Sequence, residues 1–322
     1  MLMESASAAA GNIEIMFLRQ RGDDPFIATP ERTAQIVEVA NRIARFISEA
    51  NSTLDIAIYD FRLHDEAAAI IANALRERAA HNVVIRIIYD ATTEPDGDVM
   101  PATSPAHLEA DKKAPGTDTF VRSFADIAQI KSVTGYRVLM HSKYLIRDGD
   151  TDEAAVFLGS ANYTNDSWGL QENNLLQLRS RPLAAYFSKN FTNLFTSGRI
   201  AERPAVRDVD VLRVADVPVT VAFAPEQSPA IIKEIVGAIT AARRRLLVAS
   251  VVLSSGPILA ALSEAIDRGM SCAGIYDGPQ MDQVRRQWQA AHLGADKINT
   301  WDTERSREKR VSPPKEGQRK CL

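Results

Sequence analysis

Two stretches of the chain share one order of predicted elements: an amphipathic helix, an apolar strand, a second helix, and a second strand that ends in Ile-Tyr-Asp. The first stretch runs from Glu31 to Asp90 and the second from Ala230 to Asp277. A strand, a helix and another apolar strand in this order predict a parallel β-α-β unit with a right-handed connection. The chain is therefore predicted to have an α/β fold with an internal duplication. Two similar β-α-β units without common origin are the alternative.

Apolar residues recur at helical spacing in Glu31–Glu49 and His64–Ala80, and each helix is followed by an apolar strand, at Leu54–Tyr59 and Val83–Asp90. The stretch Ala91–Gly116 is rich in Pro, Gly, Asp and Thr and predicts a long loop. Three further strands and a closing helix are predicted at Tyr136–Arg147, Ala154–Leu158, Asn174–Leu178 and Leu183–Phe195.

In the second stretch, helices are predicted at Ala230–Arg243 and Pro257–Arg268, and strands at Arg245–Leu253 and Ala273–Asp277. The chain is accordingly divided into four parts. These are an N-terminal lead-in (residues 1–30), a first domain (31–200), a partial second repeat (215–301) and a charged tail (302–322). Eleven of the 21 tail residues are charged, which is typical of disorder.

The composition is that of a soluble globular protein, with 45% hydrophobic and 25% charged residues among 322. The net charge of −3 provides no overall attraction to nucleic acid or anionic lipid. Any surface that binds phosphate must therefore be local. The internal basic run Arg243-Arg244-Arg245 precedes a predicted strand.

Cys272 and Cys321 cannot form a disulfide framework, and neither has the spacing of a zinc ligand. No apolar run reaches the ~18 to 20 residues of a membrane span, and the N-terminus lacks the basic and apolar regions of a signal peptide. We therefore expect no transmembrane segment, no metal and a cytoplasmic location.

One segment carries most of the chemical information in the sequence. His141, Lys143 and Asp148 have the spacing H-x-K-x-x-x-x-D, and Gly159-Ser160-Ala161-Asn162 follows. In a strand, residues two apart point to the same face, so His141 and Lys143 are predicted to lie side by side. Ser160 and Asn162 repeat that spacing on the next strand.

These residue types suit attack on a phosphodiester. A neutral imidazole escapes the repulsion that an anionic nucleophile meets, so His141 is the predicted nucleophile and would form a phosphohistidine. Lys143 would neutralise charge on the non-bridging oxygens, to which Ser160 and Asn162 would donate hydrogen bonds.

Glu172 is the predicted acceptor that orients the imidazole, by analogy with other histidine–carboxylate pairs. Asp148, at the end of the same strand, is either structural or a charge partner of the site. Taken singly, a histidine on a strand is more often an ordinary core or surface residue. The joint pattern is much rarer and favours function. Tyr59, Tyr89 and Tyr163 are predicted to be packing residues, and His292 a half-exposed helix residue.

The motif of His141, Lys143 and Asp148, followed by Gly159-Ser160-Ala161-Asn162, resembles the HKD motif of the phospholipase D superfamily. The resemblance covers Glu31 to Leu178, and more weakly Ala230 to Gly278. It implies a mixed β-sheet sandwiched between helices and phosphodiester cleavage without metal or cofactor through a covalent phosphohistidine. In this family two such motifs meet across a pseudo-twofold axis, where one histidine attacks and the other protonates the leaving group.

The sequence departs from the family pattern in two respects. Ten residues separate Asp148 from Gly159, which predicts a longer hairpin turn than usual. His141 lies 51 residues after Asp90, and the same step from Asp277 falls at position 328, beyond Leu322. We therefore expect the second half-site to be missing, with a frameshifted tail as one explanation. A homodimer that builds the site from two copies is the alternative.

The resemblance favours a phosphodiesterase of the phospholipase D type, acting on a phospholipid. An endonuclease of the same superfamily is the main rival, and phosphatidyl transfer would use the same site with an alcohol in place of water. The third hypothesis is a truncated protein that binds phosphate without turnover.

Overall fold

The computed structural model describes residues 7–22, 24, 26–91, 116–135, 138–201 and 210–290. The chain divides into two compact units: unit 1 contains residues 1–203 and 210–225, and unit 2 contains residues 204–209 and 226–322. The predicted boundary between residues 200 and 215 therefore lies too early. The hairpin of β11 (Asp210–Val214) and β12 (Val217–Val221) belongs to unit 1, because Val214 and Val221 are buried in its core.

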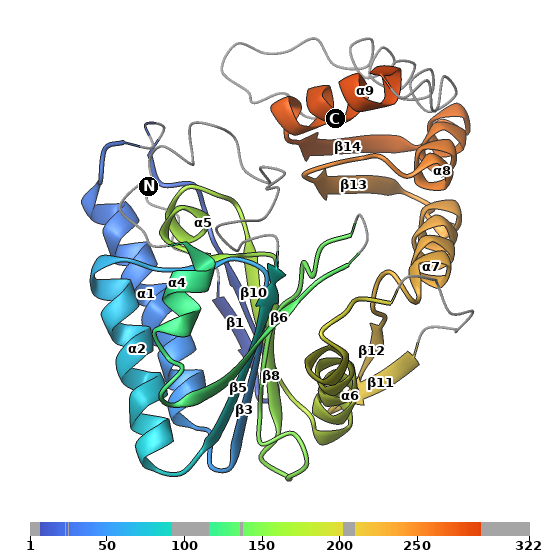
Figure 1. Cartoon of the computed structure of the whole chain (residues 1–322). Helices are drawn as coiled ribbons and strands as arrows, with labels where there is room; N and C mark the ends of the chain where they lie inside the picture. The colour runs from blue at the N-terminus through green and yellow to red at the C-terminus, as the bar shows by residue number, and fades with distance from the viewer. Residues whose placement is uncertain are drawn as a thin grey trace. The chain divides into compact units, whose positions relative to one another are not determined.

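Unit 1 is built on an eight-stranded mixed sheet with the strand order β1-β2-β10-β8-β7-β3-β5-β6. Strands β3, β5 and β6 are parallel, whereas every other neighbouring pair is antiparallel. Helices α1, α2 and α4 lie on one face of the sheet and α6 on the other (Figure 1). The predicted fold class, a mixed sheet sandwiched between helices, is confirmed. The sheet strands are β1 (Ser7–Ala10), β2 (Ile13–Phe17), β3 (Thr53–Ile58), β5 (Val84–Asp90), β6 (Ala128–Val133), β7 (Lys143–Arg147), β8 (Ala155–Gly159) and β10 (Asn174–Arg179).

The predicted helix–strand–helix–strand order of unit 1 is found as α1 (Pro30–Ser48), β3, α2 (Asp65–Ala80) and β5. Helix α1 begins where the Thr29 side chain accepts a hydrogen bond from the backbone N–H of Arg32, and Pro30 suits the first turn. The parallel pairing of β3 with β5 is confirmed.

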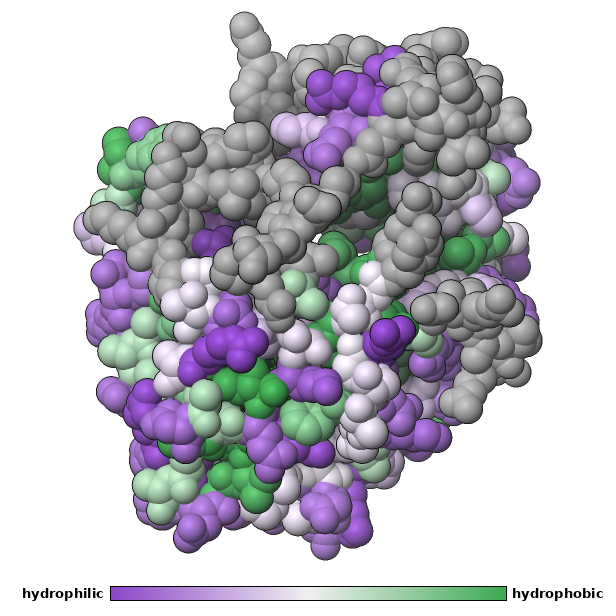
Figure 2. All heavy atoms as spheres, viewed as in Figure 1, coloured by the Kyte–Doolittle hydropathy of each residue, from purple (hydrophilic) through white to green (hydrophobic). Residues whose placement is uncertain are grey.

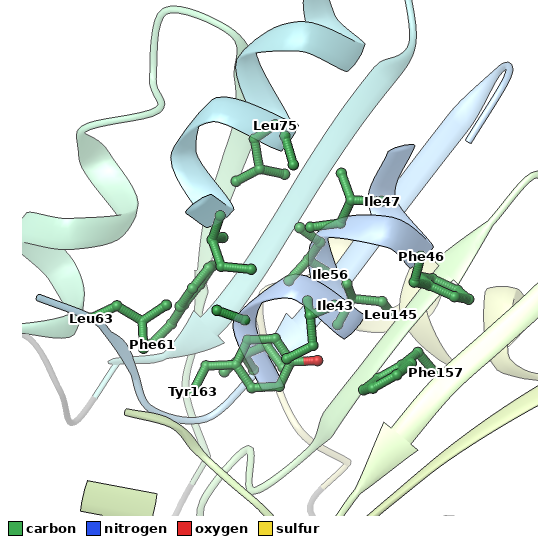
Figure 3. Close-up of a cluster of buried hydrophobic side chains, with 14 of the residues drawn as sticks. Ile43, Phe46, Ile47, Ile56, Phe61, Leu63, Leu75, Leu145, Phe157 and Tyr163 are labelled. Carbon is green, nitrogen blue, oxygen red and sulfur yellow. The ribbon is translucent and has the colours of Figure 1, made fainter. Parts of the chain in front are cut away.

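The alternation of residues along the strands separates two cores. Leu54, Ile56 and Ile58 of β3 pack with α1 and α2, whereas Ala57 packs toward α6 (Arg181–Ser197). Figure 3 shows the first core, in which α1 side chains meet residues of the sheet. Its Phe46 and Phe157 rings are 5.5 Å apart. This two-sided burial makes the central strands continuous apolar runs, as in parallel sheets generally.

The N-terminal segment differs from the predicted lead-in. Strands β1 and β2 form a hairpin, and β2 pairs with β10 over five residues. The apolar residues Ile13 and Ile15 flank Glu14, whose carboxylate accepts a hydrogen bond of 3.0 Å from Arg179. A strand this short has too few residues for a clear periodicity, and only its partner β10 reveals it.

Four short elements of unit 1 lie outside the eight-stranded sheet. Helix α4 (Thr117–Arg122) leads to β6, and the two-residue strands β4 (Phe61–Arg62) and β9 (Tyr163–Thr164) pair in parallel, followed by α5 (Asn165–Gly169). The strand predicted at Tyr136–Arg147 is shorter in the structure, where β7 begins only at Lys143.

Unit 2 contains the predicted second set of elements. Helix α7 (Ser228–Ala241), strand β13 (Arg245–Ser250), helix α8 (Gly256–Asp267) and strand β14 (Ser271–Tyr276) follow in order, and β13 pairs with β14 in parallel. Asp277 then caps α9 (Gly278–Ala290), because its side chain accepts a hydrogen bond of 2.8 Å from the N–H of Gln280. His292, Cys321 and the predicted tail lie outside the described residues.

The surface of unit 1 is mixed rather than segregated. Figure 2 shows hydrophilic and hydrophobic residues interspersed over its visible face. Within the described residues, no helix combines the length and the apolar character that crossing a bilayer requires.

Candidate active site

Most of the predicted site residues lie at one edge of the sheet of unit 1. Strand β3 ends at this edge, and Tyr59 follows it; β7 starts there, directly after His141 and Ser142. Strand β8 ends at the same edge, so Ser160 lies there as well, and its N–H donates to the carbonyl of Asn174 at the start of β10. The antiparallel order of β3, β7, β8 and β10 thus brings His141, Lys143 and Ser160 to one edge, as predicted.

Tyr59 connects the two central residues of the motif. The His141 ring lies 4.6 Å from the Tyr59 ring, centroid to centroid, and Lys143 Nζ lies 5.1 Å from the same ring. Lys143 Nζ also donates a hydrogen bond of 3.0 Å to the backbone carbonyl of His141. Tyr59 itself is buried, with 6% of its surface exposed. The sequence predicted Tyr59 to be a packing residue and did not indicate this contact. It places Tyr59 at the end of a predicted strand but does not show which distant residues pack against its ring.

The relation between His141 and Lys143 also differs from the prediction. They do not share one strand face: His141 precedes the strand and is exposed, whereas Lys143 is the first strand residue and is buried. The N–H of Tyr59 donates 2.9 Å to the carbonyl of Ser142, which holds the segment against the end of β3.

This environment shifts the pKa values of both residues. Partial desolvation of the ring by its neighbours, and then the charge of Lys143, lower the pKa of His141 from 6.5 to about 4. Burial lowers the pKa of Lys143 from 10.5 to about 7, and the charge of Asp60 partly opposes this shift. Between these two values the imidazole is neutral while the ammonium is still charged. That is the combination which attack on a phosphodiester needs.

Asp60 is a further charge beside the site that the motif did not predict. Its carboxylate accepts hydrogen bonds of 3.0 Å from Arg62 Nε and 2.7 Å from Thr117 Oγ1. Both donors hold the carboxylate near Lys143, whose charge it stabilises. The signal was present in the sequence, because Asp60 lies just past the carboxyl end of a predicted parallel strand.

Ser160 and Asn162 follow the next strand, and both already make hydrogen bonds to other groups of the protein. The Ser160 hydroxyl donates to Asn173 Oδ1 at 2.8 Å and accepts from the N–H of Asn174 at 3.0 Å. Because a hydroxyl has one proton, Ser160 must exchange this bond to donate to a substrate. The N–H of Asn162 donates to Ser167 Oγ at 3.0 Å, and its side-chain Oδ1 is buried without a partner among the described residues.

Glu172 is exposed in the connection between α5 and β10, two residues before Asn174 and hence near the same edge. The His141 ring contacts the Tyr59 ring. The role of Glu172 as the acceptor that orients the imidazole stays a prediction.

Asp148 lies at the opposite edge of the sheet. It follows the last residue of β7, five residues beyond Lys143, or about 16 Å along an extended strand. Its buried carboxylate accepts hydrogen bonds from the N–H groups of Asn51, Ser52 and Thr53 and from the Ser52 hydroxyl, at 2.7 to 3.1 Å. These bonds lower the pKa of Asp148 in spite of its burial. This geometry argues against Asp148 as a charge partner of the site and supports the structural alternative, an anchor for the start of β3.

In the part of the chain that the structure describes, no three His, Cys, Asp or Glu side chains are grouped so that they could hold a metal ion. At this edge, Lys143 and Arg62 carry positive charge and Asp60 carries negative charge.

Residues 43–195 match the family model described as cardiolipin synthase, PLD-like domain. No curated protein sequence matches the chain.

Similar solved structures include NucT from Helicobacter pylori. The two sequences are 18% identical, 57% of this chain and 97% of NucT are covered, and the TM-score is 0.36. Nuc from Salmonella typhimurium, a phospholipase D family member, has 16% identity, with 59% of this chain and 98% of Nuc covered and a TM-score of 0.34.

Phosphatidylserine synthase from Haemophilus influenzae Rd KW20 has 12% identity, with 75% of this chain and 60% of the synthase covered and a TM-score of 0.50. At this identity the similarity to the synthase shows a shared fold. The family match lies within unit 1 and spans α1 from Ile43, the HKD-like segment and nearly all of α6. The chain therefore contains a phospholipase D-like domain over residues 43–195; proteins of the phospholipase D superfamily are phosphodiesterases or phosphotransferases.

Proposed function

We propose that the protein is a phosphodiesterase of the phospholipase D type that cleaves a phospholipid phosphodiester through a phosphohistidine on His141. The observation that carries this proposal is the pairing of a neutral, exposed imidazole with a buried ammonium, both in contact with the Tyr59 ring. An exposed nucleophile can reach a phosphate, and a buried cation acts at short range with little screening by water.

In the proposed reaction, a ring nitrogen of His141 attacks phosphorus and the bond from phosphorus to the leaving alcohol oxygen breaks. Lys143 stabilises the negative charge on the non-bridging oxygens as the transition state forms. Water then attacks phosphorus, and the bond from phosphorus to the imidazole nitrogen breaks, which releases the phosphate product.

The leaving oxygen needs a proton. We assign the proton donor to a second half-site, which a second copy of the chain contributes. A site shared between copies predicts that specific activity falls when the protein is diluted until it dissociates, as followed by light scattering together with the assay. Constant specific activity from a monomer would contradict the shared site.

The purified chain should be assayed on bis(4-nitrophenyl) phosphate, on phosphatidylcholine vesicles and on plasmid DNA, with His141→Ala as the control. Release of headgroup from the vesicles without cleavage of the plasmid is the expected result. Cleavage of plasmid alone would replace the lipid substrate with nucleic acid. Equal rates for wild type and His141→Ala on every substrate would overturn the enzymatic proposal.

The covalent step has a separate test. Brief incubation with a phosphodiester that carries a radioactive phosphorus atom, followed by denaturation, should leave label on the wild-type chain and none on His141→Ala. The bond should survive alkali and break in acid, as expected for phosphorus bound to an imidazole. Label that persists in His141→Ala would place the nucleophile elsewhere.

The pH profile of kcat/KM should be bell-shaped, with limbs near pH 4 and pH 7. The acid limb reports His141, whose imidazole must lose its proton to attack, and the alkaline limb reports Lys143, whose ammonium must keep its proton. Lys143→Arg should extend the plateau to higher pH, because a guanidinium stays charged throughout this range. A wild-type profile that stays flat up to pH 9 would show that the charge of Lys143 is not required.

The same shift has a consequence for stability. Because the pKa of Lys143 is lowered, the folded state binds fewer protons than the unfolded state between about pH 7 and pH 10.5. The free energy of unfolding should therefore rise with pH across this window. Lys143→Met, which removes the desolvated ammonium, should stabilise the protein at pH 7 while it lowers activity, as urea titrations beside the assay would show.

A further inference from the structure

A second carboxylate, outside the motif, holds the segment that carries His141. Asp90 is the last residue of β5, and its side chain is fully buried, with 0% exposed. Its Oδ2 accepts a hydrogen bond from the backbone N–H of Met140, the residue directly before His141. A buried carboxylate is destabilising unless it is hydrogen bonded, and this bond offsets that cost.

The need for such a bond follows from the position of His141 outside the sheet. Ladder hydrogen bonds begin at Lys143, so they do not hold the residues before it. Three other hydrogen bonds hold the three residues before it. The Asp90 carboxylate accepts from the N–H of Met140, and Lys143 Nζ donates to the carbonyl of His141. The N–H of Tyr59 donates to the carbonyl of Ser142. Of these, Asp90 alone comes from neither the motif nor the strand paired with it.

We propose that Asp90 is a positioning residue, which fixes the backbone of His141 so that the imidazole stays against Tyr59 and next to Lys143. This role deepens the proposed phosphodiesterase function and rests on it for its effect on rate. The geometry favours it over a purely structural role, because the acceptor is directed at the segment before the nucleophile. Met140 is itself buried, with 2% exposed, which restricts its position. Because Met140 and His141 are consecutive, a shift in the backbone of Met140 also displaces His141.

The internal repeat provides a matched control. Asp90, of Ile88-Tyr89-Asp90, is the last residue of β5, and Asp277, of Ile275-Tyr276-Asp277, directly follows β14. Both aspartates therefore lie at the carboxyl end of a strand that belongs to a parallel pair. In unit 2 the carboxylate caps α9 by accepting from the N–H of Gln280. Asp277→Ala therefore removes an aspartate at the same place in the repeat and leaves the bond from Asp90 to Met140 in place.

In the kinetic test, Asp90→Ala should lower kcat on bis(4-nitrophenyl) phosphate by about 10- to 100-fold, with KM changed by no more than about twofold, because the nucleophile is misplaced while the substrate still binds. Asp90→Asn should recover part of the loss, since its amide oxygen can still accept from Met140. Asp277→Ala should leave kcat unchanged.

A second measurement, nuclear magnetic resonance of the histidine rings, does not depend on turnover. In the wild type, the His141 signal, assigned from its loss in His141→Ala, should titrate near pH 4. In Asp90→Ala the titration should move up toward 6.5 as the ring leaves Tyr59, although the loss of a negative charge alone would move it down. Asp277→Ala should show the wild-type titration.

The two measurements separate this proposal from the proposed function. A wild type without turnover would refute the function, while the titration would still decide the role of Asp90. If Asp90→Ala does not fold, Asp90→Asn is used for both readouts. A folded variant with unchanged kcat, or with a His141 titration that stays near pH 4 or moves lower, would overturn the positioning role.

Discussion

His141→Ala should lower kcat on a phosphodiester by at least about 1000-fold, because it removes the atom that forms the covalent bond. The residual rate should come from charge stabilisation by Lys143 and from substrate binding, so KM should change little. His141 is exposed and makes no contribution to the hydrophobic cores, so the variant should fold normally. Initial rates at saturating substrate, with circular dichroism as the check of folding, measure the effect.

Two variants control for this loss. His81→Ala removes an exposed histidine at the end of α2, whose ring nitrogen Nδ1 lies 2.8 Å from the carbonyl of Glu77, and should leave kcat within about twofold of wild type. Tyr59→Leu keeps the nucleophile but removes the ring that His141 and Lys143 share, and should cause an intermediate loss. A His141→Ala variant with more than about a tenth of the wild-type kcat would refute covalent catalysis at this residue.

Asp148→Ala should lower the free energy of unfolding by about 3 to 5 kcal/mol at pH 7, although it lies far from His141. The variant leaves the backbone N–H groups of Asn51, Ser52 and Thr53 without their shared acceptor, which is itself buried. Asp148 also has a φ of 51°, in the left-handed region that Asp and Asn tolerate better than Ala. Urea unfolding followed by the fluorescence of Trp168, which is buried in unit 1, measures the loss.

Asp148→Asn should lose less, because it keeps an acceptor and tolerates the same φ. Asp150→Ala, an exposed carboxylate in the same turn, should change stability by no more than about 0.5 kcal/mol.

The pH dependence of this effect has a defined sign. The pKa of Asp148 is lower in the folded state, so the carboxylate stabilises the protein above its unfolded pKa of about 3.9, and this contribution is lost as the pH falls further. The difference between wild type and Asp148→Ala should therefore shrink below about pH 4. If the two proteins unfold at the same urea concentration at pH 7, Asp148 is not the anchor of β3.

The predicted elements that were found have strong local signals. The stripe of α1, from Val39 to Ile47, and the apolar runs of β3 and β5 each span enough residues to establish a period. The elements that were missed are short or lie at an edge, as with β1, β2, β4 and β9. A strand of two to five residues is defined by its partner, and partners lie far away in the sequence.

The same distinction applies to the site. The spacing of His141 and Lys143, with Ser160 on the next strand, was sufficient to predict which residues would share an edge, because strand order and hairpin turns carry them there. Their environment could not be predicted in this way. The proximity of Tyr59 and Asp60 depends on the pairing of β3 with β7, and the bond from Asp90 to Met140 joins residues 50 positions apart.

The sequence by itself therefore determined the class of fold, the phospholipase D-like character of the first domain and the chemical types of the groups that meet at the edge of the sheet. Only the tertiary structure decided that Asp148 anchors β3 at the far edge, that His141 lies before its strand, and that Asp90 holds the segment preceding it. The reason is physical: periodicity and motif spacing are local properties of the chain. Burial, pKa shifts and hydrogen bonds depend on which residues, distant in the sequence, become neighbours in the folded protein.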